Sequence, residues 1–537
     1  MRVLLPLFAA WALLATSSPF CSYASCQAPA PEDKAPSPPA TAAASKSVPG
    51  DLGDPSPVPD GAPKLLSLVT RQRLAEHAYW LADDARQGRY TGSTAQRATA
   101  DYVQKQWKAL GLLPLGDKKT YVQSYPLQAV VLHPSSSASI AGVEIRDLAV
   151  LPAADTEKLT LSGKVLWCGK GRAEEAAASS KGRIPVVVFE KSARSNGPGG
   201  DLQAIQRYKD LAQQLAKLEA RAGIVLLPGD PGGFGNALNY YGLMPDHPQL
   251  SVGSDGRKQA MAVPLVVIAG PNATKVLTAL GIEIGNDGEF APAGELKVTA
   301  KLALRIDRSA TTTATNVCAV LEGSDNKAEA LVLSAHHDHI GRRVDGDAFN
   351  GADDNASGTA GLLTLAEAFV KCGERPSRSI VFLSVSGEEL GLWGSKYYSE
   401  HPTWPLARIV ANINIDMIGR AEPEADGSRI QITPSKDHAK YSSIGRLAAS
   451  LAPRLKISFT SGDAYYERSD HYNFAVKGVP VVFLCDGEHP DYHQVSDSAD
   501  RLDYPRMESV ARLLAWTAWD VAAAKDKPKE LGKQTDW

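Results

Sequence analysis

Two adjacent carboxylates, Glu388 and Glu389, stand in the segment SGEELGLWGS directly after the apolar run VFLSV. Neighbouring like charges repel, and the end of an apolar strand is unfavourable for them unless a cation lies nearby. A divalent metal ion would supply that cation, with one glutamate binding the metal and the other taking a proton from water. The pair therefore predicts metal-assisted hydrolysis.

Other metal-binding side chains lie in similar places. His336 and Asp416 directly follow apolar runs, whereas Asp353 and His493 lie in loops. Nitrogen and oxygen donors without sulfur suit Zn²⁺, with Mn²⁺ or Co²⁺ as substitutes. Together with Glu389 there are five such donors, which exceeds the three protein ligands usual for a single catalytic zinc ion. We therefore predict two metal ions, about 3.5–4 Å apart, that share one carboxylate.

An open α/β sheet would bring these groups together. The continuous apolar runs at 380–385 and 409–415 are typical of parallel strands buried on both faces, and 359–370 has helical spacing. In such sheets ligands bind at the carboxyl ends of the strands. We therefore predict a mostly parallel central sheet flanked by helices over residues 309–525, with an N-terminal helical part at 65–124.

The motifs SAHHDHIG, NGADDNASG, SGEELGLWGS, NIDMIG and YHQVSD follow one another in this order. As a set they resemble the co-catalytic di-zinc aminopeptidases, the M28-like peptidase family that includes bacterial leucyl aminopeptidases and glutamate carboxypeptidase II. The resemblance covers about 310–520 and the N-terminal helical part. It implies a zinc-peptidase fold and two zinc ions per chain.

The resemblance also implies a role for each metal ligand. His336 would bind one metal ion, and Asp353 would bridge both. Glu389 and His493 would bind the same metal ion, and Asp416 would bind the other.

Further roles implied by the resemblance concern catalysis. Glu388 would be the general base that deprotonates the attacking water, and Asp338 would orient His336. Tyr465 and Tyr466 lie where the family places substrate-pocket residues, so both are candidates to bind the scissile carbonyl oxygen or the oxyanion.

Some neighbouring residues receive a structural interpretation instead. We expect His337 and His339 to be structural or pocket-lining, because only His336 has the His-x-Asp spacing that the family uses. The consecutive Ser469, Asp470 and His471 are not a catalytic triad, because sequence neighbours rarely point at a common atom. We expect Ser469 or Asp470 to cap a helix.

The N-terminal sequence predicts an export signal followed by a linker. A short positive start and an apolar run to Thr16 predict a secretory signal over residues 1–24, and 25–64 is a Pro/Ala-rich linker. We therefore expect a periplasmic or secreted protein. Cys26 follows the signal as in bacterial lipoproteins, whereas Tyr23–Ser25 before it does not match their motif, so a membrane tether through lipidation stays open.

Residues 125–308 differ in sequence pattern from the rest of the chain. Short β-like runs alternate with turns and with one helical stretch at 202–222, and the glycines of Gly232–Gly235 predict a loop. Their composition and position resemble the protease-associated (PA) domain that many family members insert before the catalytic sheet.

Charge and motif content limit the partners and the reaction. With a net charge of −3 and no block of Lys or Arg, we expect no nucleic-acid partner. We predict an aminopeptidase acting on peptides, with a carboxypeptidase or a single-zinc glutaminyl cyclase as alternatives on the same fold. A binding protein that has lost the chemistry would lack ligands or the base. The oligomeric state stays open.

Overall fold

The structure is a computed structural model that describes six stretches of the chain: residues 46–171, 180–190, 200–252, 260–283, 290–421 and 428–537. The predicted secretory signal, Cys26 and the first part of the linker lie outside them. Among the described residues, no helix combines the length and apolar character needed to cross a membrane.

The main sheet is mixed, with a parallel centre. Strands β13, β12, β14 and β17 lie side by side in that order, and each neighbouring pair is parallel. All four strands are buried along their whole length, as their largely apolar sequences predict. Antiparallel pairs extend both edges, and the predicted α/β class is confirmed. The strands are β1 (Leu113–Pro114), β2 (Val122–Leu132), β9 (Gln249–Ser251), β11 (Gly294–Leu321), β12 (Ala330–His336), β13 (Ser379–Val385), β14 (Ile409–Ile415), β15 (Arg429–Thr433), β16 (Ser458–Ser461) and β17 (Val481–Cys485).

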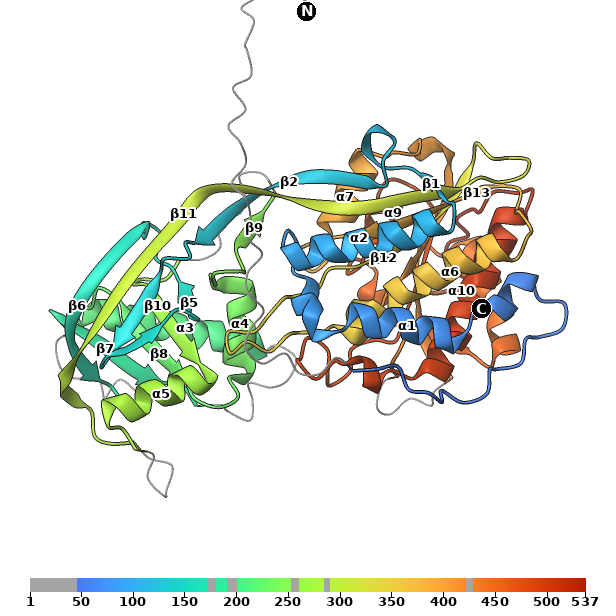
Figure 1. Cartoon of the computed structure of the whole chain (residues 1–537). Helices are drawn as coiled ribbons and strands as arrows, with labels where there is room; N and C mark the ends of the chain where they lie inside the picture. Colours follow the sequence, from blue (N-terminus) through green and yellow to red (C-terminus); the bar gives the residue numbers. More distant parts are fainter. Residues whose placement is uncertain (1–45, 172–179, 191–199, 253–259, 284–289, 422–427) are drawn as a thin grey trace, which may run out of the picture. The chain divides into compact units, whose positions relative to one another are not determined.

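Helices cover both faces of the main sheet (Figure 1). Leu331 and Leu333 of β12 pack into a core with α1, α2, α6, α8 and α10, whereas Val332 between them packs into a core with α7 and α9. This alternation follows from the two-residue period of a strand. The helices are α1 (Arg71–Leu81), α2 (Thr94–Ala109), α6 (Gly358–Lys371), α7 (Trp393–Glu400), α8 (Ser443–Leu451), α9 (His471–Ala475) and α10 (Tyr504–Ala523).

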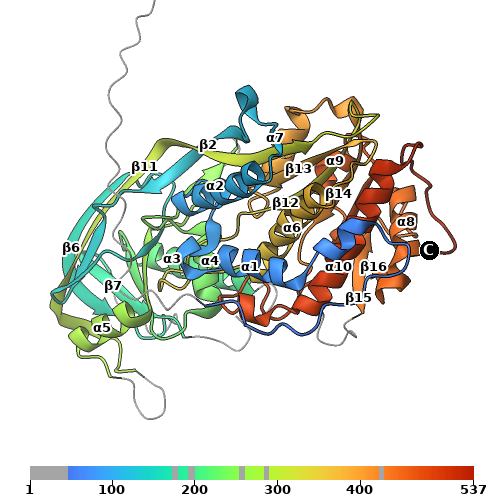
Figure 2. The ribbon, with the colours of Figure 1, turned by 45° about the vertical axis from the view of Figure 1, so that its right-hand side comes forward.

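Strand β11 connects the main sheet to a second sheet (Figures 1 and 2). Its first half pairs with β3 and β6, and its second half pairs with β2 and β13. We call residues 133–305, which contain the second sheet, the insert. Helix α5 covers one face of this sheet, and α3 and α4 cover the other. The elements are β3 (Ser137–Ile140), β4 (Val143–Ile145), β5 (Ala149–Leu151), β6 (Lys158–Trp167), β7 (Arg183–Val188), α3 (Gly200–Lys217), β8 (Gly223–Leu227), α4 (Gly232–Tyr241), β10 (Leu265–Ala269) and α5 (Gly270–Leu280).

One local prediction is wrong. Gly232–Gly235 was expected to form a loop, but it is the first turn of helix α4. The glycines permit close packing there, because a Cβ at Gly235 would lie 2.9 Å from Pro231 Cγ and 3.0 Å from Arg343 Cδ. The predicted insert boundaries at 125 and 308 fall inside strands β2 and β11. Strand β11 runs from the second sheet into the main sheet, whereas β2 pairs only within the main sheet.

A buried ion-pair cluster ties α1 to α10. The Glu508 side chain has no exposed surface, and its Oε2 accepts hydrogen bonds from Arg71 Nη2 at 2.8 Å and Ser56 N at 3.0 Å. Its Oε1 lies 3.3 Å from Arg512 Nη2. Burial alone would raise the pKa of Glu508, but these hydrogen bonds and charges hold the pKa below its usual value.

We expect Glu508→Gln to destabilise the protein by about 3 kcal/mol, because it leaves buried cations without a counter-charge. Urea unfolding at neutral pH measures this loss. Since the folded-state pKa is depressed, the contribution is complete above the unfolded-state pKa and disappears as pH falls through the folded-state value. The matched control is Glu530→Gln, which removes a half-exposed partner of Lys440 and should cost less than about 1 kcal/mol. Equal losses in the two variants would contradict the role of Glu508.

Candidate metal centre

Two groups of metal-binding side chains lie beside the carboxyl ends of the parallel strands. Within each group, one donor atom from every residue lies within 4.8 Å of the others. The first group has three members and the second has four: His336, Glu388 and Asp416, and His339, Asp354, Glu389 and His493. Strand ends and the loops that follow them supply these residues, as expected for a site in an open α/β sheet.

The carboxylate of Asp354 lies between the two groups. Its Oδ1 is 3.4 Å from His336 Nε2, and its Oδ2 is 3.0 Å from His493 Nε2. One oxygen thus faces each group, which is the arrangement that a carboxylate shared by two metal ions needs.

The structure corrects the sequence prediction for the shared carboxylate. Asp353, predicted for that role, belongs to neither group. Its Oδ1 accepts a hydrogen bond from Gly419 N at 2.8 Å, and its Oδ2 is 3.2 Å from His489 Nε2. Asp353 and Asp354 are adjacent, so only the backbone path of Ala352–Ser357 decides which carboxylate enters the centre.

The first group is held from behind by polar partners. His336 Nε2 lies 3.3 Å from Asp416 Oδ1 and 3.9 Å from Glu388 Oε2. On the other side of the ring, His336 Nδ1 lies 3.3 Å from the backbone oxygen of Asp338 and 3.6 Å from its Oδ1, which is beyond hydrogen-bond distance, so the orienting role of the Asp338 carboxylate stays a prediction. Ser469 Oγ donates to Asp416 Oδ2 at 2.7 Å, so Ser469 positions a site carboxylate and does not cap α9.

The second group contains a histidine that the sequence did not assign to it. His493 Nε2 lies 3.2 Å from Glu389 Oε2, and His339 Nδ1 lies 2.5 Å from Glu389 Oε1. The other histidine of the motif, His337, is buried and contacts Gln96 Nε2 at 2.7 Å. The position of His339, three residues after His336, was visible in the sequence, but the direction of its side chain depends on the loop that follows β12.

The two neighbouring glutamates differ in proton affinity. Burial and the charges of Asp416 and Glu389 raise the pKa of Glu388 well above its usual value, although His336 opposes them. Burial would also raise the pKa of Glu389, but His493 and His339 outweigh it and lower the pKa to about 2. Such a separation of two carboxyl pKa values is typical of a proton-transfer group beside a permanently ionised group.

A small pocket opens beside the first group. It has a volume of about 40 Å³, and its lining includes Glu388, Asp416, Tyr465 and Phe483. Tyr465 thus lies where a substrate-binding role is feasible. Tyr466, the other predicted candidate, is not part of this lining, and its ring packs against His438 with the centroids 4.2 Å apart.

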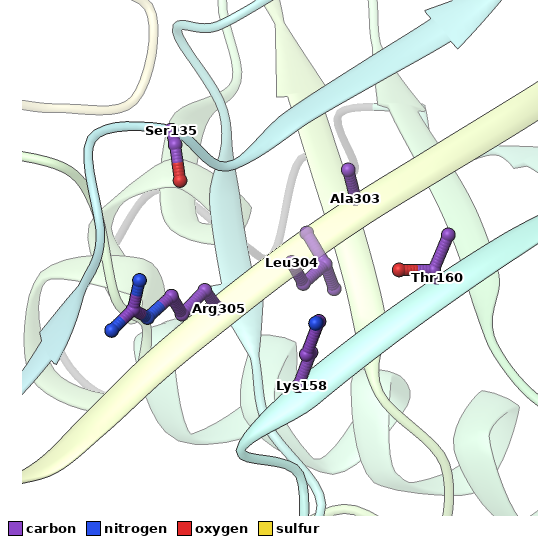
Figure 3. A pocket seen from close by; sticks show the side chains of 6 residues that line it. All are labelled: Ser135, Lys158, Thr160, Ala303, Leu304 and Arg305. Carbon is purple, nitrogen blue, oxygen red and sulfur yellow. The ribbon is translucent and has the colours of Figure 1, made fainter.

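A larger hollow of about 560 Å³ lies in the insert (Figure 3). Its lining includes no member of either donor group and consists of Ser135, Lys158, Thr160, Ala303, Leu304 and Arg305. The residues suited to chemistry therefore surround the smaller pocket.

The donor set fits two zinc ions. It contains imidazole nitrogens and carboxylate oxygens without sulfur, which Zn²⁺ binds well. The crevice is strongly anionic: burial would lower the pKa of His493, yet Glu389 and Asp354 raise it to about 10. An α/β sheet with such a centre at its strand ends is typical of metal-dependent hydrolases.

Comparisons with known proteins match the catalytic region to a peptidase family. Residues 316–518 match the model of Peptidase family M28. The resemblance predicted from the motifs is confirmed for this segment, which contains all five motifs.

Relatives of known name and structure agree with this resemblance. Aminopeptidase YwaD of Bacillus subtilis is 24% identical over 472 residues, covering 86% of this chain and 88% of that protein. A probable leucine aminopeptidase of Arthroderma otae is 26% identical over 217 residues, covering 39% of this chain and 58% of that protein. The structure of BSAP, a zinc aminopeptidase from Bacillus subtilis, has a TM-score of 0.53 at 19% identity and covers 85% of this chain and 97% of that one. That likeness shows the shared fold.

The two adjacent aspartates give a direct test of the centre. We expect Asp354→Asn to lose most of the bound zinc, because one carboxylate oxygen faces each donor group. Asp353→Asn, the matched control, should retain about two zinc ions per chain, because its side chain lies outside both groups. Plasma mass spectrometry of the zinc-loaded, gel-filtered proteins measures the ratio. Full zinc content in Asp354→Asn would contradict the shared-ligand assignment.

Proposed function

We propose that the protein is a two-zinc aminopeptidase that removes N-terminal residues from peptides. The observation that carries the proposal is that three neighbouring carboxylates differ in their contacts and in their pKa values. Asp354 faces both donor groups, Glu389 contacts the histidines of the second group, and Glu388 has a raised pKa beside the pocket.

The chain's own side chains define two positions for zinc. His336 and Asp416 would hold one ion, His493 and Glu389 would hold the other, and Asp354 would belong to both. The zinc ions, when bound, would polarise the scissile carbonyl group and increase the acidity of water.

Glu388 is the residue suited to move protons. It is 11% exposed, lines the pocket, and lies 3.9 Å from His336, the longest of the distances given above for the first group. A carboxylate with a raised pKa can accept a proton from the attacking water and later donate it to the leaving amine at neutral pH.

The alternatives fit the site less well. A carboxypeptidase for acidic substrates needs an available cation, but Arg468 in the pocket wall is paired with Glu488 at 2.7 Å. A single-zinc glutaminyl cyclase would not need two donor groups with a shared aspartate. A binding protein without chemistry would not need a glutamate poised as Glu388 is.

The pocket suggests which N-terminal side chains are preferred. Met417, Phe483 and Cys485 form a buried apolar cluster against which Tyr465 packs, and all four residues line the pocket. An apolar side chain would gain free energy by leaving water there, so we propose a preference for apolar N-terminal residues.

The cellular address and the assignment of the insert are also proposals. The N-terminal sequence supports export to the periplasm or the medium, with lipidation at Cys26 as one form of retention. The β-rich insert between β2 and β11 supports a PA-like domain.

The first test is mass spectrometry of a mixed peptide pool incubated with the zinc-loaded mature protein. We expect stepwise loss of N-terminal residues, fastest for apolar ones. Loss from the C-terminus would reassign the protein to the carboxypeptidases, and loss of ammonia from N-terminal Gln would reassign it to the cyclases. An untouched pool with both zinc ions present would sink the proposed activity.

Glu388→Gln tests the proposed base. It removes proton transfer while keeping the shape of the side chain, so kcat should fall about 10²- to 10⁴-fold with zinc content unchanged. Glu389→Gln is the matched neighbour and should lose zinc as well as activity. Wild-type turnover in Glu388→Gln would rule out this mechanism.

A further inference from the structure

The loop that carries His493 adopts an unusual backbone conformation. His493 has a φ of 54°, in the left-handed region that non-glycine residues seldom occupy. Such a conformation persists where surrounding contacts hold it. One contact is with Tyr492, whose ring stacks on His493 with the centroids 3.8 Å apart. Others come from the insert.

Helix α4 of the insert turns one polar face toward the loops of the metal centre. Asn236, Asn239 and Tyr240 share this face, because residues three and four apart in a helix are neighbours. Asn236 Nδ2 donates to the backbone oxygen of His493 at 3.4 Å. Asn239 Nδ2 donates at 2.7 Å to the backbone oxygen of Ile340, which follows the first histidine of the second donor group.

Tyr240 contacts the imidazole of His493 directly. Its Oη lies 2.8 Å from His493 Nδ1. The other ring nitrogen, Nε2, faces the second donor group, at 3.0 Å from Asp354 Oδ2 and 3.2 Å from Glu389 Oε2. A metal ion bound at Nε2 needs the lone pair of that nitrogen, so the ring proton must stay on Nδ1. The Nδ1–H group then donates to Tyr240 Oη.

We propose that Tyr240 is a positioning residue through which the insert holds His493 for one of the two metal ions. A hydrogen bond at the second ring nitrogen fixes the tautomer and the orientation of a metal-binding histidine. The inference rests on one part of the proposed function, which is the presence of two metal ions. It does not depend on which substrate the enzyme cleaves. The insert would then be part of the metal centre, because the Tyr240 hydroxyl group comes from α4, which packs on the second sheet.

The test uses Tyr240→Phe in the full chain, which removes the hydroxyl group and keeps the ring. Competition with a chromophoric chelator measures the two zinc affinities of each protein. We expect one affinity to fall about 10- to 100-fold and the other to stay at its wild-type value. In the cobalt-substituted protein, the visible absorption of one position should change. The matched control is Tyr241→Phe, at the next residue of α4 and about 100° further around the helix axis, which should bind both ions as the wild type does.

Two results would overturn the inference. One is a Tyr240→Phe protein with both affinities unchanged. The other is equal weakening at both positions together with a lower Tm of the metal-free protein, because that pattern indicates general loosening. The proposed activity fails separately: wild-type protein that binds two zinc ions and leaves peptides uncut would disprove the aminopeptidase and leave the role of Tyr240 standing.

Discussion

The structure depends on the burial of four carboxylates in one crevice. Their side chains are at most 11% exposed, and they belong to Asp354, Glu388, Glu389 and Asp416. Carboxylates so close together repel strongly where water is excluded, and the nearby histidines offset only part of that repulsion. Two divalent cations would offset the remainder. The rigid strand ends and partners such as Ser469 hold the donors together. The favourable free energy of folding the whole sheet therefore offsets the repulsion among the carboxylates.

The parts of the site that the sequence could predict are those at strand ends. Strands β12 and β14 are buried on both faces, so their apolar runs mark where they end, and His336 and Asp416 stand at those ends. Asp354, whose carboxylate lies between the two donor groups, belongs instead to the irregular segment before α6. Its path depends on tertiary contacts, such as that between Asp353 and Gly419 N, which no local pattern encodes. The resemblance identified the motif but assigned the shared role to Asp353, whereas its neighbour Asp354 lies in a donor group.

The insert was harder to predict for a related reason. A stretch with three glycines among four residues has low intrinsic helix propensity, so Gly232–Gly235 read as a loop. Tertiary packing decides otherwise, because Phe234, Ala237 and Leu238 of α4 are buried in the core of the insert. Once α4 forms, it brings Tyr240 to His493 across 253 residues of sequence. Contacts between residues so far apart in sequence depend on how the two sheets share one long strand. Neither the sequence of α4 nor that of the His493 loop predicts them by itself.

The adjacency of Glu388 and Glu389 has a physical reason that only the structure makes clear. Burial tends to raise the pKa of both side chains, but His493 and His339 hold Glu389 ionised. The fixed charge of Glu389 then adds to burial and to the charge of Asp416 in raising the pKa of Glu388. A ligand must stay anionic at every working pH, whereas a proton shuttle must be able to hold a proton. In the proposed mechanism, the anionic Glu389 raises the proton affinity of its neighbour Glu388, so the repulsion between the two carboxylates would contribute to the chemistry.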